Sequence, residues 1–279
     1  MGSAPGSTRP VVVKLGGSIL TRKREAERVR PKILRRLAEE IAAVDGTSIV
    51  LLHGAGSFGH PGAKKFGLAR APEPDASAAR RNRGAAIVAG EVRRLHLLVL
   101  RELLRAGAAP WSIPVAGHAR NREGRLVALD VAPFRDALGR GVLPVSFGDV
   151  VPDEAWGWSI LSADTIALAL AKELPAGRVV FVSDVPGILA ARTGGKPTVL
   201  PEVTEAVVDG LRRVGSGPDV TGGIRGKAEA MRAIADTGVD AGLISGLKDG
   251  ELSRALRGEF VYGSWAHARP RGPSGRDGD

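Results

Sequence analysis

Two short apolar runs, each followed at once by a glycine-rich turn, constrain the fold of this chain more than any other feature. Val-Val-Val at 11–13 leads into Lys-Leu-Gly-Gly-Ser at 14–18, and Ile-Val-Leu-Leu at 49–52 leads into His-Gly-Ala-Gly-Ser-Phe-Gly-His at 53–60. Short runs of this kind are typical of buried strands. Glycine lets backbone N–H groups after a strand face a cleft, where they can bind phosphate. The two turns therefore predict a phosphoryl-transfer site.

The rest of the chain continues the alternation of strand-like and helix-like segments. The predicted strands lie at 11–15, 48–52, 111–115, 142–147, 178–183, 241–244 and 259–262. A helix opens at Pro31, where the missing N–H is harmless, and the other predicted helices lie at 75–106, 131–138, 162–174, 203–214, 224–237 and 247–256. A small hairpin is expected to turn at Glu123-Gly124. Such alternation favours a sheet with helices on both faces. The predicted fold class is therefore α/β, a three-layer αβα sandwich around a mostly parallel sheet.

The composition limits the class of protein. With 279 residues, 43% of them hydrophobic and 25% charged, the chain has the composition of an ordinary soluble globular protein with a large core. The absence of cysteine excludes disulfides and thiolate metal sites and agrees with a cytoplasmic location. No apolar run approaches the ~20 residues that span a bilayer, so we expect no membrane segment. We expect a single domain at 11–264 between a disordered leader at 1–10 and a disordered, Pro/Gly/Arg-rich tail at 265–279.

The formal net charge of +10 at pH 7 leaves two interpretations. Such a charge can serve nucleic-acid binding, or it can serve an anionic small molecule. The basic residues are spread along the chain, aromatic residues make up only 4%, and no basic motif with interleaved aromatic residues is present. We therefore expect a small anionic substrate and no nucleic acid.

Four side chains are the strongest candidates for chemistry. An ammonium at Lys14, where a strand ends in a glycine turn, can neutralise a transferring phosphoryl group, although a lysine at a strand edge is also common. His60 closes the second turn and can donate to an anion, whereas His53 is more typical of a buried structural histidine. Asp164, near the start of a helix, can hold lysines in place or simply interact with the helix dipole. Thr-Gly-Gly at 221–223, with Lys227 one turn later, predicts an anion site at a helix start.

The two turns do not match the common nucleotide-binding motifs. Neither contains the Walker pattern G-x-x-x-x-G-K-[ST], and G-x-G-x-x-G does not follow the first strand. The sequence therefore disfavours the P-loop class and weakens a dinucleotide-binding interpretation.

Taken in order, six segments resemble the amino acid kinase superfamily and, within it, the isopentenyl phosphate kinase branch. They are KLGGSILTRK at 14–23, HGAGSFGH at 53–60, FGDVV at 147–151, ILSAD at 160–164, FVSDVPG at 181–187 and DVTGG at 219–223 with Lys227. The lysine and glycine motifs are common to the superfamily, and a histidine at the position of His60 marks the isopentenyl phosphate kinase branch and its close relatives. The resemblance implies an acceptor site in about 11–150 and a nucleotide site in about 151–264.

The resemblance also implies a role for each matching residue. The residues that would contact ATP are Lys14, Gly16, Gly17, Ser18, Gly56, Asp184, Gly223 and Lys227. The residues that would bind the acceptor are Ala55, Gly59, His60 and Ala163. The implied catalytic residues are Lys14, Lys23, His60, Asp164 and Lys227, with Asp164 orienting the lysines and Lys23 near the terminal phosphates.

The chain departs from the pattern at Ala55 and Ala163, where the family often has glycine. Alanine is tolerated at these positions if φ is negative. If φ is positive, the loops must shift, because a Cβ atom clashes there. Acceptor preference is therefore less constrained by the motifs than the class of reaction.

The activity implied by the resemblance is in-line transfer of the γ-phosphoryl group of ATP, with Mg²⁺, to isopentenyl phosphate, which gives isopentenyl diphosphate for isoprenoid biosynthesis. Dimethylallyl phosphate and longer prenyl monophosphates are further candidate acceptors.

The alternative is a related phosphonate kinase such as a fosfomycin kinase, which shares the glycine turn and the histidine. A non-catalytic nucleotide sensor is disfavoured because Lys14, Asp164 and Lys227 are all present. The family also implies a homodimer.

Overall fold

The computed structural model describes residues 9–22, 25–73, 77–190, 197–214 and 223–269. Its centre is a seven-stranded sheet in the order β13-β12-β9-β1-β2-β6-β3. The neighbouring strands are parallel except for the antiparallel pair β12–β13 at one edge. The strands are β1 (Val11–Leu15), β2 (Ile49–His53), β3 (Pro110–Ser112), β6 (Leu143–Phe147), β9 (Arg178–Ser183), β12 (Asp240–Ser245) and β13 (Gly263–Ala266).

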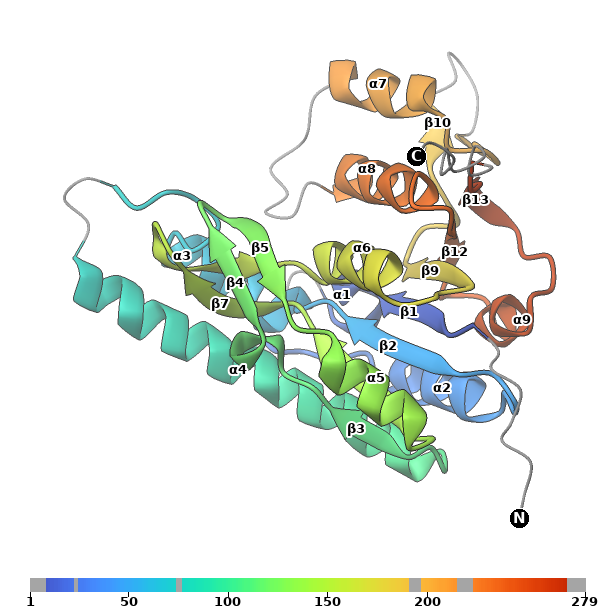
Figure 1. Ribbon diagram of the computed structural model, residues 1–279, viewed down its shortest axis with the longest axis horizontal. Coiled ribbons are helices and arrows are strands. Elements are labelled where there is room, and N and C mark those ends of the chain that lie inside the picture. Colours follow the sequence, from blue (N-terminus) through green and yellow to red (C-terminus); the bar gives the residue numbers. More distant parts are fainter. Residues whose placement is uncertain (1–8, 23–24, 74–76, 191–196, 215–222, 270–279) are drawn as a thin grey trace, which may run out of the picture.

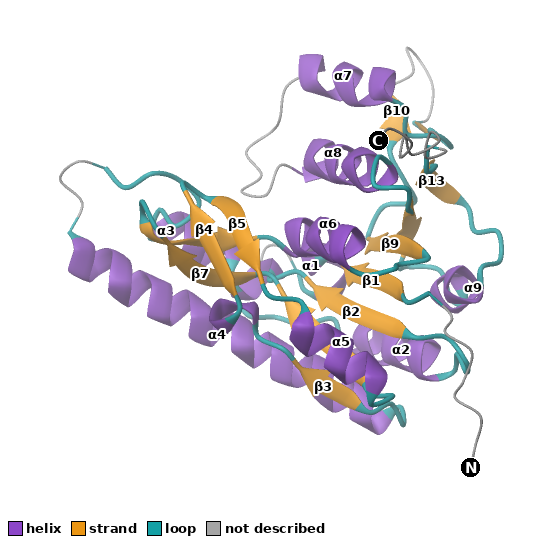
Figure 2. Cartoon of the chain, viewed as in Figure 1, coloured by secondary structure: helices purple, strands orange, loops and turns teal. Residues whose placement is uncertain are grey.

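Helices cover both faces of this sheet, so the predicted three-layer architecture is confirmed (Figures 1 and 2). One face carries α2 (Pro31–Ala42), α4 (Ala78–Arg105) and α9 (Glu251–Arg257). The other face carries α5 (Ala132–Gly139), α6 (Ala163–Glu173) and α8 (Gly223–Ala235), and α7 (Glu205–Val214) packs on α8. Each face has its own apolar core, as expected for strands that are buried on both sides.

The pleat of β1 determines which face of the sheet the Lys14 side chain lies on. Side chains alternate between the two faces of a strand. Val11, Val13 and Leu15 belong to the core shared with α2 and α9, whereas Val12 belongs to the core shared with α6. Lys14 therefore shares the face of Val12 and is directed toward α6.

A smaller four-stranded sheet in the order β5-β4-β7-β8 stands beside the central sheet and packs against α4. Its strands are β4 (Ala119–Arg122), β5 (Arg125–Leu129), β7 (Asp149–Asp153) and β8 (Gly157–Leu161). The remaining elements are short: α1 (Gly17–Leu20), α3 (His60–Lys65), the 3₁₀ turns η1 (Gly56–Phe58) and η2 (Val115–Gly117), and the ribbon of β10 (Leu189–Ala190) and β11 (Thr198–Val199). The expected hairpin turn at Glu123-Gly124 is confirmed, with φ values of 52° and 72°.

The hairpin of β7 and β8 was not predicted, and three predicted boundaries are wrong. The strand expected at 111–115 ends at Ser112, because Pro114 begins a 3₁₀ turn. The helix expected from 247 begins at Glu251, because Gly250 has a left-handed φ of 76°.

The last edge strand lies at Gly263–Ala266 rather than at 259–262. It is fixed there by Trp265, which pairs with Gly242 and packs against it so closely that a Cβ atom on Gly242 would lie 2.5 Å from the indole ring. Phe260, inside the predicted strand, is 81% exposed. Strand β13 thus runs two residues into the segment expected to be a tail. Across the described ranges, no helix has both the length and the apolar character needed to cross a bilayer.

Candidate phosphoryl-transfer site

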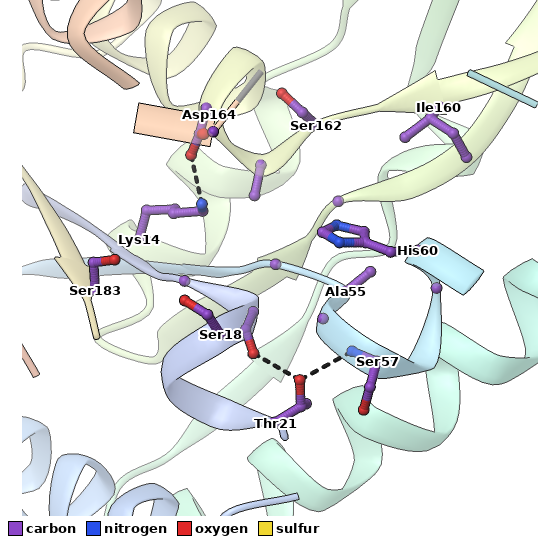
Figure 3. A pocket seen from close by; sticks show the side chains of 18 of the residues that line it. Lys14, Ser18, Thr21, Ala55, Ser57, His60, Ile160, Ser162, Asp164 and Ser183 are labelled. Atoms are coloured by element: carbon purple, nitrogen blue, oxygen red, sulfur yellow. Dashed lines mark hydrogen bonds and ion pairs between the residues drawn. The ribbon is translucent and has the colours of Figure 1, made fainter. Parts of the chain in front are cut away.

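A cavity of about 600 Å³ lies at the carboxyl ends of β1, β2 and β9, where parallel α/β sheets generally bind ligands. Both glycine turns line it, together with the first turns of α6 and α8 (Figure 3). Of the residues predicted from the sequence, it brings together Lys14, Gly16, Gly17, Ser18, Ala55, Gly56, Gly59, His60, Ala163, Asp164, Asp184, Gly223 and Lys227. The predicted Lys23 and residues 219–222 lie outside the described residues.

The central interaction of the cavity is an ion pair between Lys14 and Asp164. The Lys14 Nζ atom lies 2.6 Å from Asp164 Oδ1, and both side chains are largely buried. Asp164 is held in the first turn of α6, whose N-cap residue Ser162 accepts a hydrogen bond from the Thr165 N–H. The ion pair therefore joins a residue at the end of a strand to the start of the helix that covers it.

Asp164 stays ionised because Lys14, Lys227 and His60 face it. Burial raises the pKa of this carboxyl, but Lys14, Lys227 and His60 act in the opposite direction and leave its pKa below the usual value. Lys227 lies one turn into α8, with Nζ 3.5 Å from the Gly223 carbonyl. His60 is half-buried at the start of α3. Lys14, Lys227 and His60 therefore converge on the same carboxylate.

The two glycine turns are in direct backbone contact. A Cβ atom on Gly17 would collide with the backbone N atom of Gly56, and a Cβ atom on Gly56 would collide with the Thr21 hydroxyl. Gly56 also has a φ of 52°, a left-handed conformation that favours glycine. Glycine is thus required at both positions for the turns to approach this closely.

The two alanines that depart from the family pattern fit the backbone without strain. Ala55 has a φ of −73° and a ψ of −27°. Ala163 opens the regular helix α6 and is not among the residues with positive φ. Since both positions lie in ordinary regions for an L-residue, the loops do not have to shift to accept a methyl group.

At the other end of the cavity, the first turn contacts the end of β9. The Ser18 hydroxyl donates to Asp184 Oδ1 at 2.6 Å, and the Gly16 N–H donates to the Val182 carbonyl at 2.8 Å. The Ser183 hydroxyl adds a longer contact to Asp184 at 3.3 Å. These contacts position Asp184 beside the Gly-Gly-Ser turn.

One wall of the cavity is apolar, and its residues are not among those predicted from the sequence. It is formed by Val88 and Val92 of α4, Val150 of β7 and Ile160 of β8. The α4 valines stand one turn apart in an ordinary amphipathic pattern, which does not indicate that they face a ligand. The only available signal was the long apolar helix predicted at 75–106.

An ion pair between the partly exposed Arg93 and the buried Asp149 supports this wall. Arg93 donates to both carboxylate oxygens of Asp149, at 3.1 and 3.0 Å, and Asp149 Oδ1 also accepts the Val150 N–H at 2.8 Å. Burial raises the pKa of Asp149, and Arg93 opposes that effect. The pair fixes the start of β7, which carries Val150 into the cavity.

Two buried histidines lie beneath the second turn. His53 Nδ1 contacts the Gly54 carbonyl at 3.2 Å, His53 Nε2 contacts His96 Nδ1 at 3.0 Å, and His96 Nε2 contacts the Ser112 hydroxyl at 2.8 Å. Because a carbonyl only accepts, His53 carries its proton on Nδ1 and accepts from His96, which in turn accepts from Ser112. The prediction that His53 is structural is confirmed, since its side chain is fully buried away from the cavity.

Three comparisons place this architecture among known proteins. The model of the amino acid kinase family matches residues 9–244. The isopentenyl phosphate kinase of Methanothermobacter thermautotrophicus is 32% identical over 262 residues, which cover 91% of this chain and 97% of that protein. The isopentenyl phosphate kinase of Haloferax volcanii is 35% identical, over 80% of this chain and 88% of that protein. A solved isopentenyl phosphate kinase structure superimposes with a TM-score of 0.81 at 30% identity, over 92% of this chain and 99% of its own.

The buried histidine pair makes the stability of the fold sensitive to acid. Burial lowers the pKa of His53 from 6.5 to about 4 and that of His96 to about 3. A histidine with a depressed pKa contributes its full stability above about pH 6.5 and loses it as the pH falls toward the folded-state value. For His53 alone the loss between pH 6.5 and 4 is roughly 3 kcal/mol. We expect urea unfolding to show this fall in the free energy of unfolding.

Two variants test the source of that effect. His96→Gln removes one buried titrating group and should flatten the dependence of stability on pH, although it lowers stability at pH 7.5. His267→Asn is the control, because this side chain is 64% exposed and should leave the slope unchanged. An unchanged slope in His96→Gln would show that the acid sensitivity arises elsewhere.

Proposed function

The chain belongs to the amino acid kinase family, and we propose that it transfers the γ-phosphoryl group of ATP to isopentenyl phosphate, giving isopentenyl diphosphate and ADP. Relatives at 32 and 35% identity, each matched over most of its length, are isopentenyl phosphate kinases. The proposal covers the reaction, the acceptor and the residues that act on them.

The observation that carries the proposal is that one cavity has both a cationic end and an apolar wall. Lys14, Lys227 and His60 surround Asp164, which suits two anionic phosphate groups. The valines of α4 and Ile160 of β8 suit a short hydrocarbon tail. An amino acid acceptor would need polar partners for its ammonium and carboxylate groups. The phosphonate kinase alternative gains no support from the relatives reported above.

The residues divide between the two substrates. On the nucleotide side, Lys14 and Lys227 neutralise the β- and γ-phosphates, and Asp164 keeps both ammonium groups in place. The backbone of the first turn, together with Asp184 and Gly223, contacts the nucleotide. Lys23, which is outside the described residues, is proposed to act on the terminal phosphate by its place in the motif alone. On the acceptor side, the backbone of Ala55, Gly59 and Ala163 contacts the acceptor phosphate, and His60 donates a hydrogen bond to it.

The transfer needs positioning and charge neutralisation rather than a strong base. A phosphate monoester has a second pKa near ~6, so the attacking oxygen is already deprotonated at neutral pH. That oxygen forms a bond to Pγ as the bond from Pγ to the bridging oxygen of ADP breaks, and no proton has to be removed. The fixed cations stabilise the charge that the three γ-oxygens carry in the transition state.

Mg²⁺ enters this reaction as part of the nucleotide substrate. In the described part of the chain, no group of three or more His, Cys, Asp or Glu side chains is arranged to hold a metal ion. Mg²⁺ that accompanies ATP is usually bound mainly by phosphate oxygens and water, and so it needs no such group of side chains.

We also propose that the protein forms a homodimer in the cytoplasm. Strand β3 is an edge strand, α4 packs against it, and both expose large apolar side chains, with Leu97 64%, Leu104 61% and Trp111 60% exposed. Apolar exposure of this kind is typical of surfaces that a partner covers.

Light scattering coupled to size exclusion should give about twice the chain mass of 29.0 kDa. A mass equal to one chain would contradict the proposal.

The function is tested by ADP release with Mg-ATP and a panel of acceptors. The panel contains isopentenyl, dimethylallyl and geranyl phosphates, fosfomycin and glutamate. We expect saturable turnover with isopentenyl phosphate and none with glutamate, because the wall offers no partner for an ammonium group. Turnover with fosfomycin alone would move the protein to the phosphonate kinase branch, and no turnover with any acceptor would overturn the proposal.

The role of His60 is tested by His60→Ala and His60→Gln. Loss of a donor to the reacting phosphate should lower kcat/KM for isopentenyl phosphate roughly 100-fold in His60→Ala, while the melting temperature stays close to that of the wild type. Glutamine can still donate and should recover part of the activity. His267→Ala is the matched control, because this histidine follows the edge strand β13 and does not line the cavity. Near-normal kinetics in His60→Ala would remove His60 from the mechanism.

A further inference from the structure

Thr21 joins the two glycine turns through a single side-chain atom. Its hydroxyl donates to the Gly17 carbonyl at 2.8 Å and accepts the Ser57 N–H at 2.9 Å, as Figure 3 shows. Its own N–H also donates to the Gly17 carbonyl, at 2.9 Å. The side chain is fully buried and lies at the C-terminal end of α1. Neither the motifs nor the proposed function assigns it a role.

The contact lies where the two turns are closest. Gly17 and Gly56 approach until neither has room for a Cβ atom, and the atom that fills the space over Gly56 is the Thr21 hydroxyl. On one side of this contact is the turn that carries Ser18, and on the other is the turn that continues through Gly59 to His60. Elsewhere the turns are joined by the Gly54 N–H, which donates to the Leu15 carbonyl at 2.9 Å.

We infer that Thr21 is a positioning residue that fixes the distance between the nucleotide turn and the acceptor turn. The inference rests on the proposed function, because it assigns the first turn to ATP and the second to isopentenyl phosphate. In-line transfer depends strongly on the separation of the attacking oxygen and the phosphorus atom, and a displacement of about 1 Å can lower the rate about 100-fold. Thr21 thus acts on the reaction through the two turns and touches neither reacting group.

The hydroxyl group, and not the size of the side chain, carries this role. In Thr21→Val, a methyl group replaces the hydroxyl at nearly equal volume, the buried Ser57 N–H loses its acceptor, and the crowded space over Gly56 receives a larger group. In Thr21→Ser, the hydroxyl remains and the methyl is lost. Thr21→Ala loses both groups and adds no crowding, so it carries the test if Thr21→Val does not fold.

The experiment measures kcat and KM for isopentenyl phosphate, and ADP affinity by calorimetry, in the wild type and the three variants. We expect kcat to fall between about 10- and 100-fold in Thr21→Val and Thr21→Ala, because an interaction needed in the transition state has been lost. In both variants, the KM for isopentenyl phosphate and the ADP affinity should stay within about 3-fold of the wild-type values. Thr21→Ser should recover most of kcat. Thr237→Val is the matched control, because that hydroxyl also donates to a backbone carbonyl, of Ile234 at 2.7 Å, but lies outside the cavity.

The outcomes separate the two proposals. No turnover by the wild type overturns the proposed function and, with it, the role of Thr21. An active wild type with Thr21→Val at the same kcat overturns the positioning role alone. A loss in Thr21→Ser and Thr21→Ala but not in Thr21→Val would also overturn it, since packing of the methyl group would then be the cause. A fall in ADP affinity equal to the fall in kcat would place Thr21 in nucleotide binding instead.

Discussion

The site depends on a lysine ammonium that is buried against a carboxylate. Lys14 is 8% exposed and Asp164 13% exposed, and their charged atoms lie 2.6 Å apart. Removing an isolated ammonium from water is costly, and a carboxylate at this distance offsets the cost. Lys227 and His60 also face Asp164, so one carboxylate is shared by two lysine ammonium groups, whose charge it cannot fully neutralise. The excess positive potential, in a site where water screens it poorly, is what a cluster of phosphate oxygens requires.

The sheet topology explains why residues so far apart in the sequence share this potential. In the order β9-β1-β2-β6, four neighbouring strands run in the same direction, so their carboxyl ends meet at one edge. Asp184 follows β9, Lys14 lies near the end of β1, the turn leading to His60 follows β2, and Asp149 follows β6. Because β1 lies between β9 and β2, its turn contacts both the Asp184 loop and the second glycine turn. A central position for Lys14 follows from the strand order alone.

The parts of the site that depend on strand direction and on glycine could be predicted from the sequence, whereas the parts that depend on packing could not. Lys14 and Asp164 could be predicted because a strand end and a helix start each limit where a side chain lies. The β7–β8 hairpin could not, because its hairpin turn depends on Asp153, whose carboxylate accepts four backbone N–H groups, from Glu123, Gly124, Ala155 and Trp156. A single aspartate of this kind leaves no periodic pattern. The apolar wall was missed because a valine that faces a ligand has the same spacing as one that faces a core.

The separation of the cationic end from the apolar wall assigns catalysis and selection to different residues. Every candidate acceptor with a phosphate or phosphonate group presents similar oxygens to His60, so these contacts distinguish poorly between acceptors. The tail makes the difference, because burying a methylene group contributes about 0.8 kcal/mol, and a five-carbon tail therefore contributes about 3–4 kcal/mol. The wall that supplies this energy belongs to α4 and the β7–β8 hairpin, whereas the lysines and Asp164 belong to β1, α8 and α6. Changes in the wall can therefore alter which acceptor binds without disturbing the charges that stabilise the transfer.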